Sequence, residues 1–200
     1  MKNVAILAAL LLGLASVAHA EGTASAGKAK SANCVACHQA DGNSVNPIWP
    51  KLAGQHADYI AKQLSDFKSG ARKDPTMKAM VAPLSEQDIL DLAAHFSAQT
   101  VAIGSADPAK AAAGKRLFQG GDAERGISAC MACHGPSGAG NPQAKFPSLS
   151  GQHPDYTIKA LKDFRSGTRT NDLNGMMADV AAKMTDADIE AVAAYINGLH

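Results

Sequence analysis

The feature that most constrains this chain is a five-residue pattern, Cys-x-x-Cys-His, that occurs twice. The copies cover residues 34–38 and 130–134 and use all four cysteines of the 200-residue sequence. Two thiols about one helical turn apart can add to the two vinyl groups of one haem, and the next residue then places an imidazole under the iron. The pattern predicts two covalently bound haem c groups, held by Cys34, Cys37, Cys130 and Cys133, with His38 and His134 as axial iron ligands.

Two other uses of paired cysteines compete with this interpretation. A zinc ribbon has about 15–20 residues between its cysteine pairs, whereas these pairs begin at positions 34 and 130. A redox-active disulfide is expected near a βαβ pattern, and none surrounds either pair. Neither alternative explains why a histidine follows both pairs, so haem attachment is the favoured hypothesis.

The two motifs lie in two copies of one longer sequence. Residues 50–72 align without gaps on residues 147–169, with 14 identities in 23 positions. Such self-similarity indicates a tandem duplication. We expect an N-terminal domain over residues 21–103 and a C-terminal domain over residues 104–200, joined through a linker near 97–109, with an extra loop at 119–128 in the second copy.

Helical signals dominate both copies. Ser-x-x-Asp at residues 85–88 and Thr-x-x-Asp at 185–188 are typical of capping boxes, each followed by apolar residues at helical spacing. A second amphipathic helix is expected at 58–69 and again at 155–166, with a glycine after each, and a short helix before each haem motif. The sequence therefore predicts an all-α protein, in which a buried porphyrin supplies apolar surface that a 4% aromatic content does not.

Residues 1–20 have the pattern of a secretory signal peptide. Lys2 precedes an apolar run over residues 4–14, and Ala-His-Ala at 18–20 is typical of a cleavage site. A membrane anchor, the alternative, needs about 18 or more apolar residues. We therefore expect cleavage after Ala20 and export of the remaining chain.

The second axial ligand separates an electron carrier from a catalyst, because methionine closes the iron whereas an open iron can react. Met77 lies seven residues before Leu84, and Met177 lies seven residues before position 184, the counterpart of Leu84. This equal spacing, and a predicted loop setting, favour Met77 and Met177 as iron ligands. Met80 and Met176 remain the runners-up.

Histidines are rival ligands. His56 and His153 follow Gly-Gln in both copies and precede a predicted helix, where a packing role is favoured over iron binding. His95 is expected on the polar flank of a helix, and position 195 of the second copy is Tyr. His200 is terminal, and neither of these last two receives a role.

Residues around each haem can also be predicted. A ligating imidazole usually donates its other N–H to a carbonyl, and Pro50 and Pro147 follow their motifs at similar distances. Arg72 and Arg169 recur after the second helix. They are expected either to pair with haem propionates or to face solvent.

The sequence resembles the dihaem cytochrome c4 family. The resemblance rests on the two equal Cys-x-x-Cys-His domains, the doubled Pro-x-Leu-x-Gly-Gln-His-x-Asp-Tyr stretch, Asn-Asp at 171–172 before Met-Met at 176–177, and the ending at 195–200. It covers essentially residues 21–200. The resemblance implies two class I cytochrome c folds related by a pseudo-twofold axis, and periplasmic electron transfer, often toward a terminal oxidase. It also implies axial pairs of His38 with Met77 and His134 with Met177.

We therefore expect a periplasmic electron carrier that docks weakly with a redox donor and a redox acceptor. Its two domains are expected to pack with haem edges facing, so that electrons cross between them. Basic and acidic residues are balanced, eight and eight in 21–103 and ten and ten in 104–200, which argues against nucleic-acid binding and strong charge steering. The alternatives are a dihaem peroxidase with one open iron and a haem subunit of a larger oxidoreductase.

Overall fold

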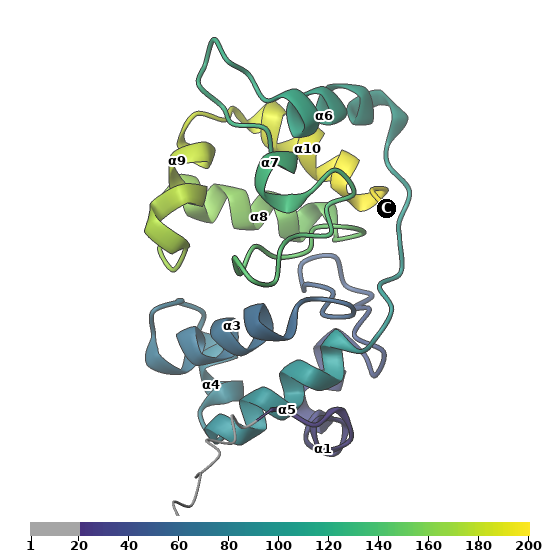
Figure 1. Cartoon of the computed structure of the whole chain (residues 1–200), viewed down its shortest axis with the longest axis vertical. Helices are drawn as coiled ribbons and strands as arrows, with labels where there is room; N and C mark the ends of the chain where they lie inside the picture. The colour runs from purple at the N-terminus through teal and green to yellow at the C-terminus, as the bar shows by residue number, and fades with distance from the viewer. Residues whose placement is uncertain (1–20) are drawn as a thin grey trace, which may run out of the picture.

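The computed structural model describes residues 21–200, and the expected signal peptide lies outside this range. Figure 1 shows two helical units stacked along the long axis and joined by one extended strap. Within the described range the only β-structure is two isolated bridges, so the expected all-α class is confirmed. None of the helices described is both long and apolar enough to cross a membrane.

The two units repeat the same order of helices. The N-terminal half contains α1 (Ala24–Lys30), α2 (Ala32–His38), α3 (Ala57–Ser69), α4 (Pro75–Val81) and α5 (Glu86–Ser97). The C-terminal half contains α6 (Pro108–Gly120), α7 (Met131–His134), α8 (Pro154–Arg165), a 3-10 turn (Leu173–Gly175), α9 (Met176–Ala182) and α10 (Asp186–Asn197). The first haem motif lies in α2, and the second consists of the N-cap of α7 and all of α7; each follows a helix, as the sequence predicts.

The last helix of each half begins at a complete capping box. The Ser85 hydroxyl accepts from the Asp88 amide while the Asp88 carboxylate accepts from the Ser85 amide, and Thr185 and Asp188 form the same pair of bonds. Each box satisfies backbone donors that a helix start leaves unpaired. Both predicted helix starts are therefore confirmed.

Each half is built on a close crossing of its first and last helices. A Cβ atom on Gly27 of α1 would overlap the carbonyl oxygen of Asp91 in α5, and a Cβ on Gly114 of α6 would overlap that of Ala191 in α10. Only glycine lets the two backbones approach this closely. The crossings hold the ends of each unit together and leave the haem motif beside the last helix.

His95 differs from its expected position on a polar helix flank. Its side chain is buried at the α1–α5 crossing, where its Cβ lies near Gly27 and its ring lies 5.0 Å from that of Phe96. Burial, with the charge of Lys28 adding to it, lowers the pKa of His95. The equivalent Tyr195 packs on Phe118, so this helical position is a packing site in both halves.

The two halves contact one another through reciprocal glutamines. Gln55 donates to the Ser148 carbonyl and accepts from the Ser148 amide, both at 2.9 Å. Gln152 in turn accepts from the Lys51 amide at 2.9 Å and donates to the Lys51 carbonyl at 3.0 Å. The halves therefore pack against each other, rather than behaving as two separate units on a flexible linker.

Candidate haem sites and the interface between them

The cysteines of each motif lie on one turn of helix. Cys34 and Cys37 belong to α2, while Cys130 caps α7 and Cys133 lies within it. No two of the four are joined in a disulfide. Burial raises the pKa of the Cys34 thiol before haem attachment, and raises that of the Cys130 thiol to about 11.

The motif histidines are buried and oriented through one ring nitrogen. His38 Nδ1 lies 2.9 Å from the Pro50 carbonyl oxygen, and His134 Nδ1 lies 2.9 Å from that of Pro147. The predicted acceptors are thus confirmed in both halves. Burial lowers the pKa of both imidazoles against the opposing effect of these bonds, which favours the neutral ring that binds a metal.

This arrangement fits a covalent haem in each half. Because a carbonyl oxygen can only accept, Nδ1 of each ring is the donor in this hydrogen bond. Nε2 is then the nitrogen able to bind iron. In the described part of the chain, no cluster of three or more His, Cys, Asp or Glu side chains is arranged to hold a metal ion. The donor set in each half is the one that haem c requires.

The methionine candidates differ in exposure. Met77 and Met177 are half-buried, whereas Met80 is 45% exposed and Met176 is 37% exposed. Met177 packs on the same apolar cluster as Cys130. The half-buried pair is the one that the equal spacing favours.

The loop setting expected for these methionines is wrong. Met77 lies in the first turn of α4, where the Asp74 carboxylate accepts from its amide at 3.0 Å, and Met177 is the second residue of α9. In α9 the comparable bond runs from the Ala178 amide to the Asp172 carboxylate, also at 3.0 Å. In each half an aspartate thus accepts from a first-turn amide, which supports a short helix that the sequence pattern did not reveal.

His56 and His153 each reach across to the other half. His56 Nε2 lies 2.8 Å from the Ala139 carbonyl oxygen, and His153 Nε2 lies 2.7 Å from that of Ser44. This agrees with a packing role and not with iron binding. The partner backbone lies in the loop after each motif histidine, so each half holds the loop of the other.

Arg72 and Arg169 also cross the boundary, and the solvent-facing alternative is wrong. Arg72 Nη2 donates to the Tyr156 hydroxyl at 3.0 Å, and Arg169 Nη2 donates to the Tyr59 hydroxyl at 2.9 Å. The Arg72 guanidinium also stacks on Phe67, and Arg169 stacks on Phe164 in the same way. Sequence reasoning expected the two domains to pack together but missed these arginine–tyrosine bonds, although the doubling of the residues in the repeat was a signal for them.

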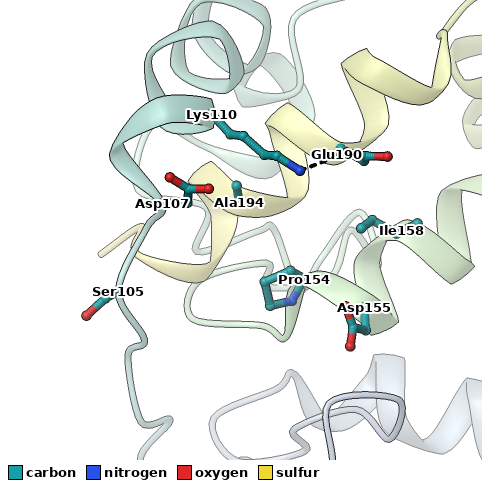
Figure 2. Close-up of a pocket in the computed structure, with 8 residues that line it drawn as sticks. All are labelled: Ser105, Asp107, Lys110, Pro154, Asp155, Ile158, Glu190 and Ala194. Atoms are coloured by element: carbon teal, nitrogen blue, oxygen red, sulfur yellow. Dashed lines mark hydrogen bonds and ion pairs between the residues drawn. The ribbon is translucent and has the colours of Figure 1, made fainter.

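A separate pocket lies away from the haem motifs. It has a volume of about 270 Å³ between the linker, α6, α8 and α10. Figure 2 shows Lys110 extending toward Glu190 at its edge, where the two side chains form an ion pair of 2.8 Å. No cysteine, motif histidine or candidate methionine lines this pocket, so it is not a haem site.

Comparisons with known proteins agree with this arrangement. The cytochrome c family model matches residues 24–98 and again 111–200. A cytochrome c4 of Stutzerimonas stutzeri is 50% identical over 210 residues, covering 100% of both chains. The crystal structure of reduced recombinant cytochrome c4 from Pseudomonas stutzeri is 51% identical and covers 90% of this chain and 100% of its own, with a TM-score of 0.87. A thiosulfate dehydrogenase electron acceptor of Stutzerimonas stutzeri strain A1501 is 42% identical and covers 81% of this chain and 76% of its own.

Two helical units, each with a haem motif and an oriented histidine, define a c-type cytochrome with two haem domains. The cytochrome c4 proteins that this chain matches transfer electrons and are not enzymes. The chain belongs to the cytochrome c family and, within it, to the dihaem cytochrome c4 family, with two covalently attached haem c groups.

Proposed function

We propose that the eight residues singled out by the sequence hold the two haem groups. Thioether bonds to haem form at Cys34 and Cys37 in the N-terminal half and at Cys130 and Cys133 in the C-terminal half. The axial iron ligands are His38 with Met77, and His134 with Met177. The observation that carries this proposal is the matched pair of histidine–proline bonds, each in a half with one half-buried methionine in the spacing-matched position.

Each residue has a distinct part in electron transfer. When bound, each haem would supply an iron that can accept and release one electron. The cysteines fix the haem in its domain, and the proline carbonyls hold the imidazole rings and increase their basicity. The methionine sulfurs close each iron and raise its potential, so the chain carries electrons without binding a substrate at the metal.

The boundary between the haem domains is proposed at Ile103 and Gly104. On the N-terminal side, the Ala102 amide donates to the Asn43 side chain at 2.7 Å. On the C-terminal side, the Gly104 amide donates to the Asn197 carbonyl at 3.0 Å. The linker is therefore hydrogen-bonded to the N-terminal half at Ala102 and to the C-terminal half at Gly104.

The two haem edges are proposed to face each other across the interface, with electrons passing between them. Support comes from the two buried guanidinium groups of Arg72 and Arg169, which lie between the halves. In the described residues neither makes an ion pair or a hydrogen bond to a carboxylate. Haem propionates would supply that missing charge.

The proposed location is the periplasm, reached through the signal peptide at residues 1–20. The proposed partners are transiently docked redox proteins, one donor and one acceptor, with a terminal oxidase as one acceptor class. The match to a thiosulfate dehydrogenase electron acceptor supports a sulfur-oxidising enzyme as one donor class. Among the described residues, the lack of a membrane-spanning helix is compatible with such docking.

Intact-mass measurement of the purified chain tests the residue assignments. The exported chain should carry the mass of two haem groups and begin at Glu21. Cys37→Ala and Cys133→Ala should each impair attachment in their own domain, which reduces the count toward one. Two haem groups retained in the double variants Cys34→Ala/Cys37→Ala or Cys130→Ala/Cys133→Ala would contradict the assignment.

A further inference from the structure

The side-chain oxygen of Gln63 accepts hydrogen bonds from both halves of the protein. Gln63 lies on α3 and is only 7% exposed. Its Oε1 accepts from Arg72 Nη1 of its own half at 2.8 Å. It also accepts from Arg169 Nη2 at 3.1 Å and from Asn171 Nδ2 at 3.0 Å, both in the other half. Three donors, two of them cationic, therefore share one carbonyl oxygen with two lone pairs.

The bonds to Gln63 have no equivalent in the other copy of the repeat. The aligned position on α8 is Ala160, which has no side-chain acceptor. The segment that supplies Asn171 is also longer in the second half, because Met177 lies eight residues after Arg169 whereas Met77 lies five after Arg72. The arginine–tyrosine bonds are thus reciprocal, but the arginine–glutamine bonds are made on one side only.

In the described residues, no other side chain accepts hydrogen bonds from both guanidinium groups. Each is stacked on a phenylalanine of its own half, and Asp66, the nearby carboxylate, bonds to Lys62 and to the Asn171 amide instead. Two like charges repel when buried in a medium of low dielectric constant. A shared neutral acceptor offsets this repulsion and fixes where both charges lie.

We propose that Gln63 is a positioning residue for electron passage between the two haem groups. It orients Arg72 and Arg169 together and makes the electrostatic environments of the two irons unequal. This inference rests on the proposed function, because it requires a haem on each side of the interface. It adds one residue whose bonds to the two arginines have no counterpart in the other half.

The test uses the full haem-loaded chain with two readouts. The first is amide hydrogen exchange at Lys51 and Ser148, whose N–H groups donate only to side chains of the opposite half and so report undocking. The second is a redox titration that gives the difference between the two haem potentials. Gln63→Ala should speed exchange at both amides about fivefold, the factor that corresponds to one ordinary hydrogen bond. It should also reduce the difference between the two haem potentials. Position 63 then has the same residue as its counterpart Ala160, so neither half has a side-chain acceptor there.

Two further variants separate positioning from general stability. Gln63→Glu keeps an acceptor oxygen, so exchange should stay slow, while the added negative charge should lower both potentials. Gln87→Ala is the matched control, because Gln87 is an exposed glutamine on α5 whose bonds stay within its own half. It should leave both readouts unchanged.

Each result decides the inference. Unchanged exchange and an unchanged potential difference in Gln63→Ala would overturn it. Faster exchange with an unchanged difference would also overturn it, because Gln63 would then only hold the halves together. Failure of the proposed function is recognised separately, in the unsubstituted chain, by fewer than two covalent haem groups.

Discussion

Arg72 donates to the hydroxyl of Tyr156 at 3.0 Å across the boundary between the two halves. Burial alone would raise the pKa of Tyr156, but the charges of Arg72 and Arg169 outweigh it and lower that pKa. The repeat-related bond from Arg169 to Tyr59 makes the contact reciprocal. These arginine–tyrosine bonds form a charged, buried part of the interface between the two haem domains. Directional polar bonds of this kind suit an interface that must keep one relative orientation of the domains.

Removing the Tyr156 hydroxyl should weaken the interface between the two haem domains. Tyr156→Phe leaves a buried guanidinium N–H without its acceptor, so we expect a loss of about 1–3 kcal/mol in the free energy of unfolding. Chemical denaturation of the full chain measures it. Tyr195→Phe is the control, because Tyr195 packs on Phe118 within its own half and its hydroxyl makes no hydrogen bond in the described structure. Equal losses in both variants would show that the bond across the boundary contributes nothing.

The close helix crossing predicts a sharp contrast between two glycines of α6. Gly114→Ala forces a Cβ into the Ala191 carbonyl oxygen of α10, so the C-terminal domain should lose about 3 kcal/mol or more. Gly120→Ala meets no atom within 4 Å and should change stability by about 1 kcal/mol or less. Thermal unfolding of the two variants makes the comparison. A Gly114→Ala protein as stable as Gly120→Ala would show that the crossing is not tight.

The extra loop of the second half is held by an ion pair with a predictable pH dependence. Arg125 donates to both oxygens of the Asp188 carboxylate, at 2.6 and 3.1 Å. Arg125 also donates through Nε to the Asp122 carboxylate at 2.7 Å, and these contacts lower the pKa of both Asp188 and Asp122. A lowered folded-state pKa stabilises the fold above the unfolded value of about 3.9, and that contribution is lost as pH falls through the lower folded value.

Arg125→Met should therefore cost stability at pH 5–7, and the difference from the unsubstituted chain should shrink below about pH 4. Denaturant unfolding over this pH range measures the difference. Arg116→Met is the control, because within residues 21–200 the Arg116 guanidinium bonds only to a carbonyl of its own helix. A difference that is constant down to pH 2 would contradict the assignment of this contribution to the Asp188 and Asp122 carboxylates.

Much of the fold follows from local sequence signals. The capping boxes at Ser85 and Thr185 predict two helix starts correctly, because the bonds that form them join residues three positions apart. The proline acceptors for His38 and His134 were also predictable, since the motif fixes the histidine and the repeat fixes the spacing.

The interface could not be predicted in the same way. Gln55 and Ser148 are 93 positions apart, and no local pattern indicates which distant backbone a glutamine will meet. His95 was misplaced for a related reason, because its helix face is polar in sequence but is covered by α1 in the fold. Duplication of a polar residue is nevertheless a sequence signal for the interface. Gln55, His56 and Arg72 all recur in the second copy, and all three form hydrogen bonds to the other half.

The central claim is that each half closes its haem iron with one particular methionine. The far-red absorption of the oxidised chain, recorded with and without added cyanide, tests it most directly. We predict a methionine–iron charge-transfer band from both haem groups, with Met77→Ala and Met177→Ala each removing one contribution, opening that iron to cyanide and lowering its potential. Met80→Ala and Met176→Ala, which change the more exposed methionines, should leave the band intact. A band that survives in Met77→Ala and Met177→Ala but is lost in Met80→Ala or Met176→Ala would contradict the account.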